Sequence, residues 1–157
     1  MPPSTRNMTN RVKKAGETDI MVMNIDMAKK IIKAAISRAQ EIDTLCSVAI
    51  VDERGFLVAL HRMDHAPIPT VDIARDKAWT AATFRMPSSD IGKFGDPATP
   101  GFGFNTQNWN DRLTTIPGGL PIRDGDDIIG GIGVSGGTPE EDVTVCEAAL
   151  AAVLKPC

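Results

Sequence analysis

Aromatic side chains are scarce in this 157-residue sequence: they make up 4% of it, and tyrosine is absent. Few residues are therefore available to stack on bases or sugars. The sequence also has no run of about 18 apolar residues, so it predicts no membrane span. The net charge is −3 and the pI is about 5.3. A surface for nucleic acid in general needs a basic stripe, so this charge balance argues against one.

Cysteine is also sparse, with only Cys46, Cys146 and Cys157. An odd count without regular spacing is not a disulfide framework. Without a Cys-x-x-Cys pair, the sequence gives no sign of a structural zinc site. Cys46 lies in an apolar run and Cys146 in a predicted helix, so we expect both to be buried, unreactive thiols.

The composition is that of a folded protein, with 42% hydrophobic and 24% charged residues, and its length favours one domain. Residues 1–19 are polar and of mixed charge, and they lack the apolar stretch of a secretory signal. We therefore predict a polar N-terminal tail over residues 1–19, a single domain over 20–157 and a cytoplasmic location.

Hydrophobic periodicity predicts helices over residues 24–42, over 70–85 and from Thr138 onwards. Shorter apolar runs separated by glycine-containing turns predict strands over residues 45–51, 56–62, 112–116, 120–123 and 127–135. Strands joined by hairpins form antiparallel sheets, whose faces the helices must cover. The predicted class is therefore α+β.

Polar residues mark the expected starts of these helices. Asn24 or Asp26 can cap the first, and Thr70 the second. The third has the strongest signal, because Thr138 is followed by Pro139 and then by Glu141, three residues after the cap.

Glycine is concentrated in one part of the chain: twelve of the fourteen glycines lie between Gly92 and Gly137. The run 130–137 has G-x-G spacing but lies within a predicted strand, so it is not a dinucleotide-binding fingerprint. It indicates a strand that another backbone approaches closely, with Ser135 at its end. Gly118 and Gly119 offer accessible backbone N–H groups beside a ligand. Residues 95–111 form a long loop, which in compact domains is usually functional.

The only histidines, His61 and His65, lie four residues apart where a predicted strand enters a proline-rich loop. Two histidines without further marked ligands are a weak signal for a divalent metal. A single axial ligand to haem iron is a smaller demand, and His61, Met63 or His65 would satisfy it. The alternative is a histidine on a sheet face and a solvated loop histidine.

Lys77 lies among alanines in the predicted second helix, where loss of solvent can lower the pKa of an amine and make it a base or an anion ligand. The alternatives are a side chain whose stem extends to water, or a structural pair with Asp64 or Asp72. Arg62 and Asp64 lie at the junction between strand and loop. Arg62 can clamp a carboxylate through two hydrogen bonds, or form a local salt bridge with Asp64.

Several motifs together resemble the GlcG/HbpS family of haem-binding-type proteins, which also includes the C-terminal domain of PduO-type corrinoid adenosyltransferases. The resemblance covers about residues 21–154. It is carried by the ordered set RMD at 62–64, DIA at 72–74, KAWTA at 77–81, GGLPI at 118–122 and GGIGVSGG at 130–137, followed by ED at 141–142.

The resemblance implies a profilin-like three-layer α/β/α sandwich with a five-stranded antiparallel sheet, assembled as a homo-oligomer. It also implies binding of haem or a corrinoid, and in some members haem degradation or redox sensing. The chain departs from the family in two places. His65 replaces the usual glycine after Arg-Met-Asp, and the segment 102–111, with Trp109, is rich in amides and suits a polar small-molecule pocket.

Three functions remain open from the sequence. The first is a ligand-binding protein that holds haem or a related tetrapyrrole, with His61 or His65 on the iron and Trp109 among the ligand-binding residues. The second is a catabolic enzyme that transfers protons on a carboxylate or carbonyl compound, with Lys77 as acid or base, His65 as its partner and Arg62 as the clamp. The third is an accessory oligomer without a ligand. One pocket is predicted to gather a common set of residues: Arg62, Asp64, His65, Lys77, Gly118, Gly119 and Ser135.

Overall fold

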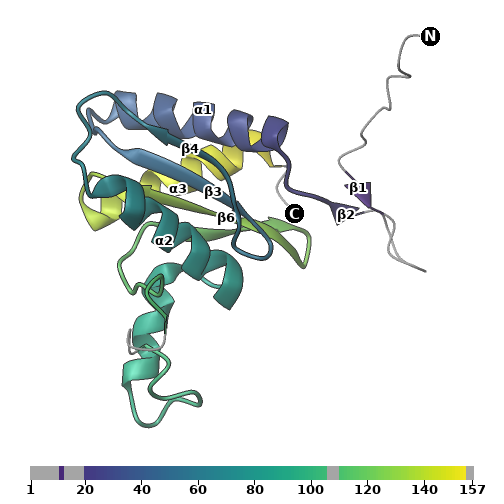
Figure 1. The fold of residues 1–157 in the computed structure, drawn as a ribbon, viewed down its shortest axis with the longest axis vertical. Helices are drawn as coiled ribbons and strands as arrows, with labels where there is room; N and C mark the ends of the chain where they lie inside the picture. The colour runs from purple at the N-terminus through teal and green to yellow at the C-terminus, as the bar shows by residue number, and fades with distance from the viewer. Residues whose placement is uncertain (1–10, 13–19, 106–109, 155–157) are drawn as a thin grey trace.

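The computed structural model describes residues 11–12, 20–105 and 110–154 of the chain. The fold is of the α+β class, as expected (Figure 1). The helices are α1 (Ile25–Glu41), α2 (Thr70–Phe84), the 3₁₀ helix η1 (Ser88–Gly95) and α3 (Pro139–Val153). The strands are β1 (Arg11–Val12), β2 (Ile20–Met21), β3 (Ser47–Asp52), β4 (Leu57–Arg62), β5 (Gly119–Asp124) and β6 (Asp127–Ser135).

The main sheet is antiparallel and has the order β4-β3-β6-β5. Among the described residues it has four strands, so the expectation of five is wrong. The missing strand is the one predicted over residues 112–116. The backbone of this segment is satisfied by side chains instead: the Thr80 hydroxyl donates to the carbonyl of Arg112 at 3.1 Å and accepts from the N–H of Thr114 at 3.1 Å. Ser88 Oγ donates to the carbonyl of Ile116 at 2.6 Å.

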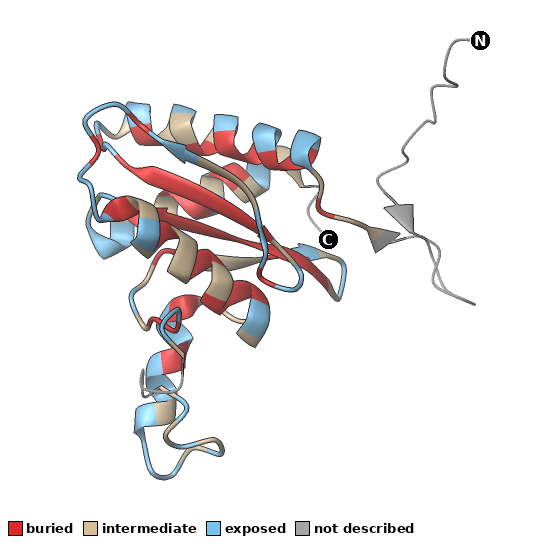
Figure 2. Ribbon diagram, in the orientation of Figure 1, coloured by how far each residue is buried: buried red, intermediate tan, exposed pale blue. Residues whose placement is uncertain are grey.

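Helices cover both faces of the sheet (Figure 1). Helices α1 and α3 pack together on one face, and α2 packs on the other, mainly against β6 and β3. Strand β3 serves both layers, since Val48 and Ile50 join the core beneath α1 while Ala49 and Val51 face α2. Figure 2 shows the consequence, with β3 and β6 buried along most of their length and the edge strand β4 partly exposed.

Small residues let α2 lie very close to β6. A Cβ on Gly133 would collide with the carbonyl oxygen of Ala74 and lie 2.6 Å from the backbone nitrogen of Ala78. A Cβ on Gly131 would collide with the carbonyl oxygen of Ala78 and lie 3.0 Å from the Cβ of Ala82. The glycine-rich strand is thus a surface for close backbone approach, as the sequence predicts.

Two of the three predicted helix caps are present. Asn24 Oδ1 accepts the N–H of Met27 at 2.9 Å, and Thr138 forms a full capping box with Glu141. The prediction for Thr70 is wrong: the cap position of α2 is Pro69, and no side chain bonds there. The hydroxyl of Thr70 instead donates to the carbonyl of Pro67 at 2.6 Å and lies 2.8 Å from Ser47 Oγ.

Cys46 and Cys146 are buried free thiols, as expected. Burial, together with the nearby Asp142 charge, raises the pKa of Cys46 to about 11. Burial also raises the pKa of Cys146, whose Sγ lies 3.2 Å from the carbonyl of Gly118. Neither thiol is thus poised to form a thiolate. Within the described ranges, no helix is long and apolar enough to cross a membrane.

Candidate functional site

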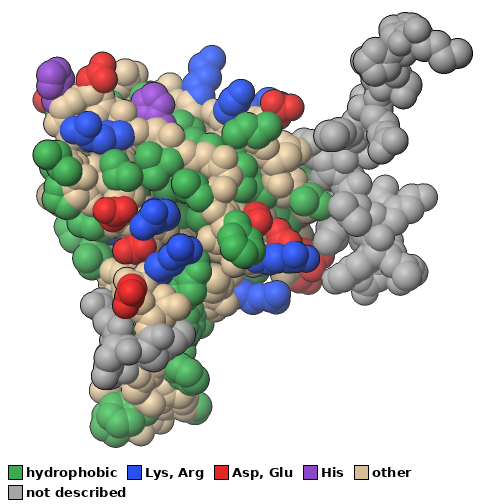
Figure 3. All heavy atoms as spheres, in the orientation of Figure 1, with side chains coloured by type: hydrophobic (Ala, Val, Ile, Leu, Met, Phe, Trp, Pro, Cys, Tyr) green, Lys and Arg blue, Asp and Glu red, His purple; other side chains and the backbone are tan. Residues whose placement is uncertain are grey.

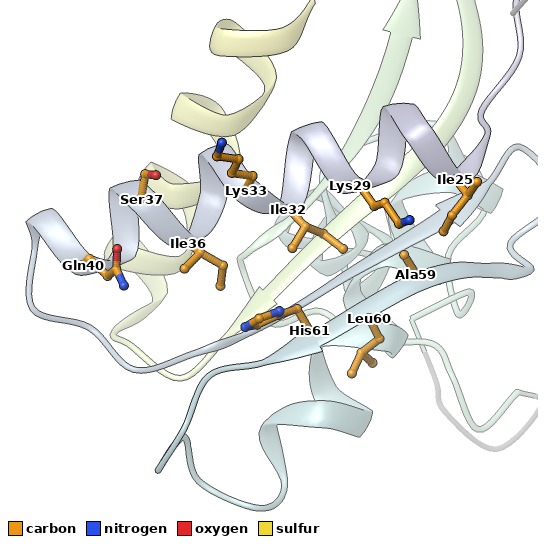
Figure 4. Close-up of a pocket in the computed structure, with 10 residues that line it drawn as sticks. All are labelled: Ile25, Lys29, Ile32, Lys33, Ile36, Ser37, Gln40, Ala59, Leu60 and His61. Carbon is orange, nitrogen blue, oxygen red and sulfur yellow. The ribbon is translucent and has the colours of Figure 1, made fainter.

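His61 lies on the exposed edge strand β4, opposite Val48 of β3. Because Val48 faces the α1 layer, and paired residues on neighbouring strands share a face, the His61 side chain is also on the α1 side. It forms no hydrogen bond to another described residue. Figure 4 shows the imidazole opposite Ile32 and Ile36 of α1. The fold thus presents a solvent-accessible imidazole toward an apolar helix face.

The space between α1 and β4 is a groove of about 570 Å³ (Figure 4). Ile32 and Ile36 extend the apolar face of α1 into it, and Ala59 of β4 contributes from the opposite side. Further lining side chains come from both ends of the groove: Ile25, Lys29, Lys33, Ser37, Gln40, Leu60 and His61. Aliphatic walls with a few polar groups are typical of small-molecule sites.

The charged side chains that line this groove are basic. Lys29 and Lys33 lie one helical turn apart on α1, and no described lining residue is acidic. In the space-filling view, basic, histidine and acidic side chains all lie along the upper edge, where α1 and β4 run (Figures 1 and 3), but the acidic ones are not among the described residues that line the groove. The groove therefore has a positive rim over an apolar floor.

Arg62, at the end of β4, and the loop residues that follow it do not line this groove. The Arg62 guanidinium donates two hydrogen bonds to the carbonyl of Ala66, at 3.0 and 2.6 Å, so it braces its own loop. Met63 is buried, and its Sδ lies 3.5 Å from the N–H of Cys46. Asp64 is exposed. The buried thioether of Met63 is thus engaged in the core.

His65 is exposed and has a left-handed backbone, with φ of 66°. It lines a second cleft of about 370 Å³, together with Asp43, Thr44 and Glu141. Thr44 Oγ1 donates to Glu141 Oε2 at 3.2 Å. This cleft has carboxylates where the groove has lysines, so His61 and His65 face opposite electrostatic surroundings. Neither cleft contains a ready metal centre, since the described residues include no group of three or more His, Cys, Asp or Glu side chains arranged to hold a metal ion.

Lys77 is fully enclosed, with 1% of its side chain exposed. Its Nζ donates to Asp142 Oδ2 and to the carbonyl of Val134, both at 2.8 Å. Burial raises the pKa of Asp142, and the hydrogen bond and charge of Lys77 oppose that shift. Asp142 Oδ1 also accepts the N–H of Gly137 at 3.0 Å. The ammonium thus links α2, β6 and α3. A role for Lys77 in proton transfer stays a prediction.

Three further predicted residues lie near Lys77. A Cβ on Gly118 would lie 2.9 Å from the Lys77 ammonium, and Gly119 N–H donates to Ser88 Oγ at 3.0 Å. Ser135 is buried at the end of β6, paired with Ser47. Gly118, Gly119 and Ser135 are thus buried, whereas Arg62, Asp64 and His65 are at the surface. Trp109 lies outside the described residues.

Sequence reasoning missed the α1 side of the groove. Lys29, Ile32, Lys33 and Ile36 belong to an ordinary amphipathic helix pattern, in which the apolar residues indicate core and the lysines indicate solvent. The signal that could have revealed the groove combines two features: an edge strand, and a histidine of that strand on the face of the sheet that this helix covers. Its recognition requires the strand order, which the sequence does not state.

Comparison with known proteins places the chain in a family. The family model described as haem degrading protein HbpS-like matches residues 23–151. The chain therefore belongs to the HbpS-like family, and the resemblance seen in its motifs is confirmed.

Individual relatives agree with this assignment. An uncharacterized 15.0 kDa protein from the dhaT-dhaS intergenic region of Citrobacter freundii is 34% identical over 131 residues, or 83% of this chain and 92% of that protein. The corrinoid adenosyltransferase PduO of Salmonella typhimurium is 30% identical over 138 residues, which are 87% of this chain but 40% of that protein.

A solved structure with the same fold contains a ligand. The crystal structure of a PduOC–haem complex superposes with a TM-score of 0.77 at 27% identity, covering 85% of this chain and 96% of that one. The family model and this structure both concern haem.

Proposed function

We propose that this protein binds haem or a closely related tetrapyrrole in the groove between α1 and β4, with His61 as the axial ligand to the iron. The observation that carries the proposal is the position of His61, an exposed imidazole lining a largely aliphatic groove of about 570 Å³. Membership of the HbpS-like family and the likeness to a haem complex support the ligand class.

The residues present fit the requirements of the ligand. The faces of a haem ring are apolar, and Ile32, Ile36 and Ala59 offer aliphatic contacts on both sides of the groove. The volume falls within the range of about 300–1,000 Å³ typical of small-molecule sites. The imidazole of His61 is the donor type that haem iron takes in many proteins.

The groove suits haem better than the cleft at His65. Haem carries two propionates, which Asp43 and Glu141 of the second cleft would repel. The groove has no acidic group among its described lining residues. When bound, haem would supply a redox-active iron; the aliphatic side chains of the groove would hold the ring, and His61 would coordinate the iron.

Titration with haemin, followed by absorption spectroscopy, tests the proposal. The wild-type protein should give a saturable Soret shift that reaches a fixed haem-to-chain ratio. His61→Ala should lose this coordination spectrum, and His65→Ala, which removes the exposed histidine of the other cleft, should keep it. The proposal is wrong if the wild-type titration is flat, or if His65→Ala alone abolishes the spectrum.

We also propose that the protein acts in the cytoplasm as a homo-oligomer. Support for self-association comes from exposed apolar side chains beyond η1, where Phe102 is 58% and Phe104 53% exposed. Figure 1 shows this segment extending away from the sheet layers. Light scattering after size exclusion should give a mass well above 16.8 kDa, and a monomer would contradict the oligomer.

A further inference from the structure

We propose that Lys29, aided by Lys33, makes the groove selective for tetrapyrroles that carry free carboxylates. This inference rests on the proposed function, because it concerns the same groove. It separates two chemical classes of ligand: rings with ionised propionates, such as haem, and rings whose side-chain carboxyls are blocked, by amidation as in cobalamin-type corrinoids or by esterification. The first class would bind more tightly.

The two lysines form a cationic rim. They lie at positions i and i+4 of α1, where Cβ atoms are about 5–6 Å apart and like charges destabilise a helix. Both are exposed, and neither ammonium has an ion-pair partner among the carboxylates of the described residues. Two ammonium groups that no described carboxylate neutralises, beside an apolar groove, are suited to an anionic ligand.

The directions of the side chains rank the two lysines. Figure 4 shows the Lys29 side chain reaching along the groove toward Ala59, whereas the Lys33 ammonium turns to the other side of α1. Lys33 also lines a separate cleft between α1 and α3. Lys29 is therefore the main carboxylate-binding group, and Lys33 joins it by rotation of its flexible stem.

The position of the iron ligand agrees with this arrangement. Figure 4 places His61 opposite Ile32 and Ile36, with Lys29 further toward the N-terminal end of α1. A ring coordinated by His61 would therefore lie against the isoleucines, with one edge directed toward Lys29. Propionates on that edge would accept hydrogen bonds from an ammonium, and charged acceptors make such bonds stronger.

The chain offers a matched control in Lys30. It is exposed, has the same charge and lies on the same helix, but it lines the cleft between α1 and α3 and not the groove. Lys30→Gln changes the net charge as much as Lys29→Gln does. A difference in ligand affinity between the two variants would thus result from the position of the lysine and not from the change in overall charge.

The experiment compares iron protoporphyrin IX with its dimethyl ester, titrated against the wild-type protein and the Lys29→Gln, Lys33→Gln and Lys30→Gln variants. The wild type should bind the diacid more tightly than the diester, and added salt should reduce this difference in affinity. Lys29→Gln should weaken diacid binding by roughly two- to five-fold, as expected for an exposed ion pair, and leave diester binding unchanged. Lys33→Gln should have a smaller effect, and Lys30→Gln none.

Two results would overturn the selectivity. One is equal affinity of the wild type for diacid and diester; the other is an equal loss in Lys29→Gln and Lys30→Gln. If both porphyrins still bind with a Soret spectrum that depends on His61, the proposed function stands and only the selectivity fails. If neither porphyrin gives a saturable spectrum, the proposed function itself fails.

Discussion

Lys77 and Asp142 are 65 residues apart in the sequence, yet their charged groups meet 2.8 Å apart in the interior, with 1% and 3% of their side chains exposed. The pair joins α2 on one face of the sheet to α3 on the other, and its ammonium also bonds to β6 through Val134. The buried charges are thus matched, and loss of one would leave the other without a partner.

Lys77→Met should therefore destabilise the fold. Removal of one partner of a buried ion pair typically costs about 3–5 kcal/mol, because the remaining charge stays desolvated. Urea unfolding followed by circular dichroism measures the change. The double variant Lys77→Met/Asp142→Leu should recover a large part of the loss. A change below about 1 kcal/mol in the single variant would contradict this account of the pair and favour Lys77 as a functional group.

The contact between α2 and β6 should not tolerate a larger side chain. Gly133→Ala places a methyl group against the backbone of Ala74 and Ala78. Overpacking of this kind costs about 1–3 kcal/mol or more. Gly92→Ala is the control, since a Cβ there would meet nothing within 4 Å. Thermal unfolding of both variants tests the contrast, and equal melting temperatures would show that α2 can move away from the sheet at little cost.

Asp76 should make stability depend on pH. It is half-buried on α2, and its Oδ1 is buried without a hydrogen-bond partner among the described residues. Burial raises its pKa, and the Arg75 charge partly opposes this. The folded state then holds the proton to a higher pH than the unfolded chain, whose aspartates titrate near pH 3.9. The contribution of Asp76 to stability should therefore fall as pH rises from about 4 through its folded-state pKa.

Asp76→Asn removes this titration. The variant should be more stable than the wild type at pH 7, and its stability should change less between pH 4 and pH 7. Urea unfolding at both pH values provides the measurement. Lower stability of Asp76→Asn at pH 7 would show that the ionised carboxylate has a favourable partner in solution.

The buried thiols should not react with thiol-specific reagents in the folded protein. With Cys157 replaced by serine, Cys46 and Cys146 are the remaining cysteines, and both are buried. Since burial raises both pKa values, to about 11 for Cys46, the native Cys157→Ser variant should not react with a thiol-specific disulfide reagent at pH 8. In denaturant both thiols should react. Rapid reaction of the native variant would mean that the structure around the buried thiols unfolds locally and often enough to expose them.

Local signals predicted the helices and most of the strands. The capping box of Thr138 and Glu141 is encoded within four residues, and the apolar period of α1 within five turns, so neither depends on the rest of the chain. The predicted strand at residues 112–116 failed because its backbone partners are the hydroxyls of Thr80 and Ser88, on distant helices. Hydrogen bonds to side chains that are distant in the sequence leave no recognisable pattern within a short stretch of residues.

The site was less predictable for the same reason. His61 was identified as a candidate from its residue type alone, but the groove forms only because β4 is the edge strand and α1 lies beside it. The alanine neighbours of Lys77 mark it as a candidate, yet its partner, Asp142, lies in another helix and not at the expected Asp64 or Asp72. Pairings between distant segments are set by the tertiary fold, which one sequence does not reveal.

The proposed position of haem is between α1 and β4, with its iron on His61. A crystal structure of the haemin-soaked or co-crystallised protein would test this position. We expect the ring to lie against Ile32 and Ile36, the His61 imidazole to coordinate the iron and a propionate to lie at Lys29. Haem coordinated by His65 in the acidic cleft, or bound without either histidine, would contradict it.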